Sequence, residues 1–125
     1  MNNPEIRFLG NDDEQILEAF LRPRLDTSLF LVSNMRMVGL NDRGQRFEGT
    51  YVAAFEDGKM AGVIAHYWNG NAIVQAPKYA DVLMRAAIER SGRPLEGFLG
   101  PGDQVTPAVE NLGLAKADYR VNNLE

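Results

Sequence analysis

Apolar and polar residues in the middle of the chain follow the pattern of β-strands interrupted by turns. Residues 49–77 contain three strand-like runs, which are separated by Asp57-Gly58 and Asn69-Gly70. Both dipeptides suit a two-residue type I′ hairpin turn, because that turn needs a positive φ at both central residues. Glycine, asparagine and aspartate adopt a positive φ at low cost. The pattern therefore predicts an antiparallel meander of three strands.

The strands of this meander are apolar on both faces, which predicts that both faces are covered. A sheet of this kind buries each face against a separate layer, and helices are the expected cover. Helical patterns lie on both sides of the meander in the sequence. The residues expected on one face are Val52, Ala54 and Ile64, and those expected on the other are Ala53, Phe55, Val63 and Ala65.

A short strand and a first helix are predicted before the meander. The strand covers residues 6–9, and the helical stripe covers residues 16–21. Asn11 is expected to cap this helix, with Glu14 in the capping-box position three residues later. Pro23 is expected to end the helix, because proline disfavours helical geometry in the residue before it.

Two further helices and a strand follow from the same reasoning. Residues 29–38 predict a largely apolar helix, for which residues 26–28 offer an N-cap and Gly39 a C-terminal end. After the meander, residues 78–90 predict a helix and residues 94–100 a strand. Because a helix connects them, this strand is expected to lie parallel to the last strand of the meander.

The last part of the chain predicts one more helix and a tail. The helix opens at Gly102-Asp103 or at Thr106-Pro107 and ends at residues 112–114, while residues 115–125 show no settled pattern. The predicted order of elements is β-α-α-β-β-β-α-β-α. The expected fold class is thus a mixed α/β (α+β) domain with helices on both faces of a mostly antiparallel sheet.

Composition narrows the classes of protein and partner. The chain has 125 residues, of which 45% are hydrophobic, and this suffices for one domain with a core. Its net charge of -4, with no cluster of lysine and arginine, argues against binding to nucleic acid. There is no cysteine, so disulfides and thiolate chemistry are excluded. Neither a signal-peptide pattern nor a membrane-spanning apolar run is found, so no membrane partner is expected and the predicted location is cytoplasmic.

The predicted order of elements resembles the fold of the GCN5-related N-acetyltransferases (GNAT), the acyl-CoA N-acyltransferase-like fold. Residues 74–79 resemble the family's approach to its acetyl-CoA loop, and residues 83–90 resemble the segment after that loop. In the family, backbone N–H groups of a glycine-containing loop bind the pyrophosphate at a helix N-terminus. That loop is absent here. Residues 108–114 match the framework of a later family helix, with Val109 in place of a tyrosine that can protonate the leaving thiolate.

Three stretches are more narrowly similar to the N-terminal half of certain bacterial two-lobed GNAT proteins, namely residues 51–55, 65–71 and 100–105. This resemblance implies a GNAT-like domain over residues 1–114. It also implies that residues 115–125 form a tail, which would link the domain to an absent second lobe. The partner implied is that second lobe or a second copy in a homodimer.

The residue types and the resemblance together give the candidate site residues. His66, the single histidine, is a candidate catalytic base because its ordinary pKa lies near neutral pH, and a hydrogen-bonded core imidazole is the alternative. Trp68 is a candidate for stacking on a substrate, or closes the edge of the core. Gln75 lies where pantetheine enters in relatives, or satisfies a backbone group. Lys78 and Tyr79 are the other candidate contacts to acetyl-CoA.

Two remaining polar sets complete the candidates. Gln104 is a candidate substrate-binding amide, while the neighbouring Asp103 suits a helix cap. Asp12, Asp13 and Glu18 belong to a solvated helix start, and no histidine or further carboxylate cluster accompanies them. No metal site is therefore predicted.

Three functions follow from this reading. The first is a GNAT-fold lobe without its own pyrophosphate loop, which does not catalyse acyl transfer unaided. The second is an active acetyl-CoA-dependent N-acetyltransferase acting on a small amine or an N-terminus. The third is a module that binds a small ligand or a protein and keeps only the fold. The fold alone does not decide among them.

Overall fold

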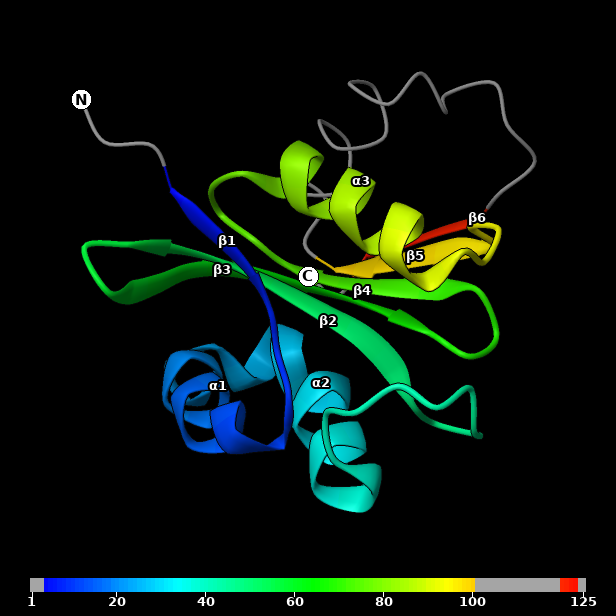
Figure 1. Ribbon diagram of the computed structural model, residues 1–125, viewed down its shortest axis with the longest axis horizontal. Helices are drawn as coiled ribbons and strands as arrows, with labels where there is room; N and C mark the ends of the chain where they lie inside the picture. Colours follow the sequence, from blue (N-terminus) through cyan, green and yellow to red (C-terminus); the bar gives the residue numbers. More distant parts are fainter. Residues whose placement is uncertain (1–3, 101–119, 124–125) are drawn as a thin grey trace.

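A single mixed β-sheet organises residues 4–100 and 120–123, which are the residues that the computed structural model describes (Figure 1). The strands lie in sequence order across the sheet. Neighbours from β1 to β4 are antiparallel, whereas β4, β5 and β6 are parallel to one another. The strands are β1 (Glu5–Phe8), β2 (Gly49–Glu56), β3 (Lys59–Tyr67), β4 (Asn71–Gln75), β5 (Gly97–Gly100) and β6 (Arg120–Asn123).

Helices cover both faces of this sheet, which confirms the predicted mixed class. Figure 1 shows α1 and α2 below the sheet and α3 above it. The helices are η1 (Asn11–Asp13), α1 (Glu14–Leu21), η2 (Arg22–Arg24), α2 (Leu25–Val38) and α3 (Ala80–Ser91), where η marks a 3-10 helix. The connection from β4 through α3 to the parallel strand β5 is the crossover that the sequence predicted.

The two apolar faces of the meander belong to two separate cores, as predicted. The face with Ala53, Phe55, Val63 and Ala65 packs in one cluster with residues of α1 and α2. The face with Val52, Ala54 and Ile64 packs in a second cluster with residues of α3. The helical residues of the first cluster include Leu17, Leu21, Leu31 and Met35, and those of the second are Leu83, Met84 and Ala87.

One of the two predicted hairpin turns is confirmed and the other is wrong. Asp57 and Gly58 have φ of 52° and 79°, and Glu56 pairs directly with Lys59, as a type I′ turn requires. The second hairpin instead has a three-residue connection, Trp68 to Gly70, in which Gly70 has a φ of 89°. Asn69 is not in the left-handed region, because its side-chain oxygen accepts the backbone N–H of Asn71 at 3.1 Å.

The caps predicted for the first two helices are also corrected. Asp13, not Glu14, closes the first turn, because its carboxylate accepts the backbone N–H of Gly10 at 2.9 Å. Asn11 instead accepts the backbone N–H of Leu40 at 2.8 Å and so joins the start of α1 to the end of α2. The predicted cap at residues 26–28 lies inside α2, which begins at Leu25.

Helix α2 begins at Leu25, earlier than the predicted residue 29, and it directly follows the 3-10 helix that contains Pro23. Pro23 lies in η2, directly before α2, where its missing N–H removes no helical hydrogen bond. The chain therefore turns through a 3-10 helix and continues without a loop. The predicted C-terminal end of α2 is confirmed: Gly39 has a φ of 80° and donates its N–H to Met35 at 2.8 Å.

The second half of the chain follows the prediction with shifted ends. The helix predicted over residues 78–90 is α3, and it stops at Gly92, which has a φ of 68°. The strand predicted over residues 94–100 is restricted to β5. The helix predicted after residue 101 lies outside the described residues. Strand β6 lies within the stretch for which the sequence predicted no element, and it pairs with β5.

Candidate functional site

The turn between β4 and α3 holds two of the candidate cofactor residues, Lys78 and Tyr79, and both contact the same carboxylate. Lys78 Nζ lies 3.2 Å from Glu56 Oε1, and the Tyr79 hydroxyl donates to Glu56 Oε2 at 2.5 Å. Tyr79 itself has a φ of 66°, a left-handed conformation that is uncommon for a residue with a side chain. We call these three residues the Glu56 clamp. It ties the end of β2 to the start of α3.

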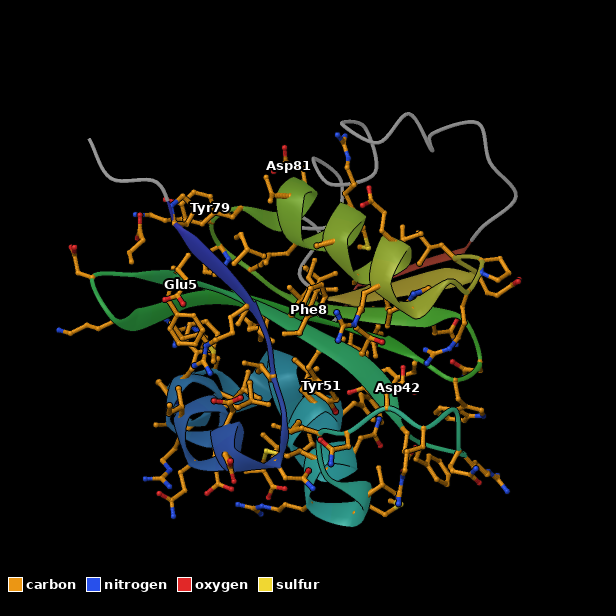
Figure 2. All side chains as sticks on the ribbon, viewed as in Figure 1. Glu5, Phe8, Asp42, Tyr51, Tyr79 and Asp81 are labelled. Atoms are coloured by element: carbon orange, nitrogen blue, oxygen red, sulfur yellow. The ribbon has the colours of Figure 1, made fainter. Side chains whose placement is uncertain are left out.

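The Glu56 clamp also sets the electrostatics of the turn. The hydrogen bond from Tyr79, and after it the one from Lys78, lowers the pKa of Glu56, so this carboxylate is ionised at neutral pH. The same hydrogen bond raises the pKa of Tyr79. Asp81 in the first turn of α3 adds a second negative charge (Figure 2). Lys78 is thus paired with one carboxylate, and Asp81 lies two residues after Tyr79.

Gln75, the third candidate cofactor residue, is buried at the end of β4. It pairs with Val63 of β3, and its side chain is on the same face as Ile73, the face covered by α1 and α2. The parallel pairing of β4 with β5 extends from Asn71 to Ile73 and so stops short of Gln75. Gln75 therefore lies beyond the paired part of these two strands, on the side of the sheet opposite α3.

Trp68, the candidate substrate contact, lines a cavity of about 300 Å³ between α2 and strands β4 and β5. Its ring packs against Phe47, with a centroid distance of 4.9 Å, and its backbone N–H donates to Glu48 at 2.9 Å. Trp68 therefore both closes the edge of the core and faces the cavity, which joins the two alternatives left by the sequence. The cavity is lined by Phe30, Asn34, Tyr67, Trp68, Asn69, Asn71, Ile73 and Leu99.

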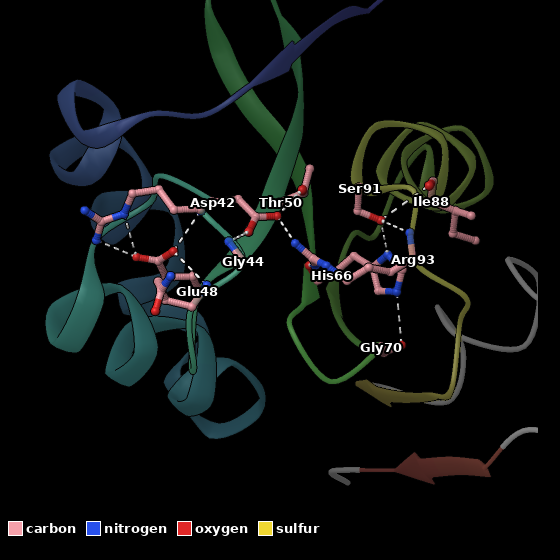
Figure 3. Close-up of polar contacts among 11 residues, drawn as sticks. Asp42, Gly44, Glu48, Thr50, His66, Gly70, Ile88, Ser91 and Arg93 are labelled. Atoms are coloured by element: carbon pink, nitrogen blue, oxygen red, sulfur yellow. Dashed lines mark hydrogen bonds and ion pairs between the residues drawn. The ribbon is translucent and has the colours of Figure 1, made fainter.

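His66 is fully buried, and both ring nitrogens have partners (Figure 3). Nε2 lies 3.0 Å from the carbonyl oxygen of Gly70, and Nδ1 lies 2.7 Å from Ser91 Oγ. A carbonyl oxygen only accepts, so Nε2 carries the hydrogen and Nδ1 accepts from the Ser91 hydroxyl. Burial lowers the pKa of His66, and the charge of Arg93 lowers it further, so the ring is neutral at pH 7.

Residues far apart in the sequence extend this network (Figure 3). Arg93 donates from Nη1 to the His66 carbonyl oxygen at 2.6 Å and from Nη2 to the Asp42 carboxylate. The same carboxylate accepts the Thr50 hydroxyl at 2.7 Å and the Gly44 N–H at 2.9 Å. Asp42 and Arg93 are 51 positions apart in the chain. The sequence reasoning missed this network, because no local pattern relates residues at such a separation.

The pairing of Ser91 with His66 has the geometry of a nucleophile next to a base, but its surroundings oppose that chemistry. A catalytic histidine needs its protonated form stabilised, usually by a carboxylate on the second nitrogen. In this network a carbonyl oxygen occupies that position, and the nearby charge is the positive one of Arg93. The arrangement therefore supports the structural alternative for His66, which joins the β3–β4 connection to the end of α3.

The buried His66 gives the protein a predictable pH dependence. The unfolded chain binds a proton at the ordinary pKa of 6.5, whereas the folded chain binds it only at lower pH. Below pH 6.5 the unfolded chain gains a proton that the folded chain does not yet bind, and this favours unfolding. The free energy of unfolding is therefore highest above pH 6.5 and falls as the pH drops from 6.5 towards the folded pKa of His66. Urea unfolding should show a loss of up to about 1 kcal/mol between about pH 7 and about pH 5.5.

His66→Gln is the control for this prediction. His66 is the single histidine, and the pKa values of Asp42, Glu48 and Glu56 are lowered, so these carboxylates titrate below the window. The variant should show a flat stability profile over the same range. The imidazole signals of the unaltered protein, followed by NMR, report the folded pKa directly. A folded pKa above 6.5 would contradict the prediction.

The described part of the chain has neither a cluster of metal-binding side chains nor a membrane-spanning helix. Within residues 4–100 and 120–123, no three histidine, aspartate or glutamate side chains lie together as potential metal ligands. None of the helices in these residues has the length and apolar character needed to cross a bilayer. Gln104, the remaining candidate substrate residue, lies outside the described residues.

Comparison of the chain with protein-family models, with curated proteins and with solved structures gives no match.

Proposed function

We propose that this chain is a GNAT-like domain that does not bind acetyl-CoA by itself and serves as the non-catalytic lobe of an acetyltransferase. Its partner would be a second lobe or a second copy of the chain. The observation that carries this proposal is the Glu56 clamp. Lys78 and Tyr79, the candidate contacts to a pyrophosphate, are already bound to a carboxylate.

The energetics of the β4–α3 turn support this proposal. A diphosphate is bound by several charge-assisted hydrogen bonds, each worth about 1.5–3 kcal/mol. At this turn the charge of Lys78 is partly neutralised by Glu56, which weakens its attraction for a phosphate, and the negative charge of Asp81 in the first turn of α3 opposes an anionic ligand. A glycine-containing loop is also absent between Gln75 and Ala80. Losing two such bonds lowers affinity by about a hundredfold or more.

The cavity beside Trp68 gives this lobe a role in the proposed acetyltransferase, which is to shape the pocket for the acceptor substrate. Its walls combine the aromatic rings of Phe30 and Trp68 with the side-chain amides of asparagines on α2 and β4. Small-molecule sites have this composition, with mostly apolar walls and a few polar groups that fix orientation. The ligand expected there is a small molecule with an apolar body.

Calorimetric titration of the full chain with CoA and acetyl-CoA tests the proposal. The unaltered chain should give no saturable heat up to about 1 mM ligand. Glu56→Gln removes one carboxylate charge and keeps a hydrogen-bond acceptor for Tyr79, so this variant should gain measurable CoA affinity. Glu89→Gln is the matched control, because Glu89 is an exposed carboxylate of α3 outside the clamp, and it should bind no better than the unaltered chain.

Two outcomes of the titration would contradict the proposal. Micromolar binding of acetyl-CoA by the unaltered chain, with release of CoA when small amines are added, would instead establish an active acetyltransferase. Equal CoA affinity in Glu56→Gln and Glu89→Gln would mean that the Glu56 clamp does not govern the turn.

A further inference from the structure

A second cavity, of about 550 Å³, lies far from the β4–α3 turn, at the other end of α3. It is formed where β1 ends over β2 and where the loop after α2 meets the end of α3. Figure 2 shows Phe8, Tyr51 and Asp42 in this part of the molecule. Its volume is within the range of small-molecule sites, about 300–1,000 Å³. The lining residues used here are Phe8, Leu9, Leu40, Asp42, Arg90 and Arg93.

The charges in this cavity leave one cation without a counterion. Three charged side chains line it, those of Asp42, Arg90 and Arg93. Asp42 and Arg93 form an ion pair that is largely withdrawn from solvent, with side-chain exposures of 16% and 19%. Both oxygens of Asp42 are also occupied by Thr50 and Gly44. Among the described residues that line the cavity, Arg90 is therefore the charge without an ion-pair partner.

Arg90 is an exposed residue whose side chain contacts Phe8 through the face of its guanidinium. Its guanidinium lies over the ring of Phe8, 4.7 Å from the centroid. Within residues 4–100, no carboxylate forms an ion pair with it. Stacking uses the face of the guanidinium, whereas its N–H donors lie in the plane and match the two oxygens of a carboxylate. A preorganised donor of this kind loses little entropy when it binds an anion.

Apolar side chains also line the cavity, beside the polar groups of Asn41, Thr50 and Ser91. Leu9 and Leu40 are buried, and Tyr51 contributes its ring, because its hydroxyl is bonded to Tyr67 at 2.7 Å. A ligand that fits this mixed lining has one carboxylate and a small apolar body. We propose that this cavity binds a small organic monocarboxylate, with the carboxylate on Arg90 and the apolar body on Leu9, Leu40 and Tyr51.

An NMR titration of the full chain tests this site. The probes are phenylacetate, isovalerate and the neutral analogue phenylacetamide, with inorganic phosphate as a competing anion. At least one carboxylate should shift the backbone signals of Leu9, Leu40 and Gly44 to saturation, whereas phenylacetamide and phosphate should not. Arg90→Gln should weaken carboxylate binding about tenfold or more, as expected for the loss of one charge-assisted bidentate contact.

Two matched variants test whether carboxylate binding depends on the guanidinium of Arg90. Arg85→Gln removes an arginine that is also exposed on α3 but lines a different cavity, and it should leave binding unchanged. Arg90→Lys keeps the charge but loses the planar fork, so it should bind with intermediate affinity. The proposal is overturned if no carboxylate gives saturable shifts, if Arg90→Gln binds as well as the unaltered chain, or if phosphate or phenylacetamide binds equally well. None of these outcomes depends on CoA binding.

Discussion

Replacing Gly70 with alanine should lower the free energy of unfolding by about 2–4 kcal/mol, as measured by urea denaturation. Two effects combine at this position. Gly70 has a φ of 89°, which strains any residue with a side chain, and an added Cβ would lie 2.9 Å from the Pro94 carbonyl oxygen and against the Glu96 side chain. The Pro94 carbonyl cannot move freely away from the added Cβ. The segment that follows it is tied to the turn, because the Glu96 N–H donates to the Gly70 carbonyl oxygen at 2.8 Å.

The consequences of Gly70→Ala extend beyond the turn itself. The Gly70 carbonyl oxygen also accepts the hydrogen bond from His66 Nε2. A shift of this peptide therefore disturbs the imidazole, the approach to β5 and the pairing of β4 with β5. Amide hydrogen exchange should show loss of protection in β5 before it shows loss in β1.

Gly58→Ala is the matched control for Gly70→Ala. Gly58 has a similar φ of 79°, but an added Cβ would meet no atom within 4 Å. This variant should therefore lose about 1 kcal/mol, from backbone strain alone. The difference between the two variants measures the steric contact with the segment before β5. Equal losses would show that this contact relaxes at no cost, which would contradict the packing described here.

The second large effect is expected at the buried tyrosine pair. The hydroxyls of Tyr51 and Tyr67 are 2.7 Å apart, and the rings meet edge to face with a centroid distance of 5.7 Å. Burial raises the pKa of both phenols, so both stay neutral. Tyr67 has a second partner, Asn34 of α2, whereas Tyr51 depends on Tyr67. The two hydroxyls are therefore not equivalent.

This asymmetry predicts unequal effects for two matched substitutions. Tyr67→Phe leaves the Tyr51 hydroxyl buried without a partner and should cost about 1–3 kcal/mol of unfolding free energy. Tyr51→Phe leaves Tyr67 bonded to Asn34 and should cost about 1 kcal/mol or less. The double variant, measured in the same denaturation series, should be less destabilised than the sum of the two. Additive losses, or a larger loss for Tyr51→Phe, would show that the hydroxyls are satisfied in another way.

The proposed carboxylate cavity and the Glu56 clamp both depend on contacts between residues that are distant in the sequence. Phe8 and Arg90, like Glu56 and Tyr79, lie in separate elements that only the sheet and the α3 crossover bring together. Phe8 ends β1 at one edge, and Arg90 lies near the end of α3. No spacing in the sequence marks these pairs, since each depends on where a helix crosses the sheet.

Local features, in contrast, were predictable from short stretches of sequence. The turn at Asp57-Gly58 and the helix ends at Gly39 and Gly92 follow from residues that tolerate a positive φ. The assignment of meander residues to two faces follows from the alternation of side chains along a strand. The predictions failed where a side chain competed for a backbone group, as at Asn69 and Asp13.

The sequence by itself therefore determined the class of the fold, the antiparallel meander, its two apolar faces and the parallel crossover after α3. These properties depend on backbone preferences and side-chain periodicity over a few residues. Only the tertiary structure decided that His66 is a buried neutral ring, that Lys78 and Tyr79 are bound to Glu56, and that Arg90 lines a cavity with no ion-pair partner among the described residues. These properties arise from contacts between distant residues, and such contacts are set by sheet register and helix packing rather than by local sequence.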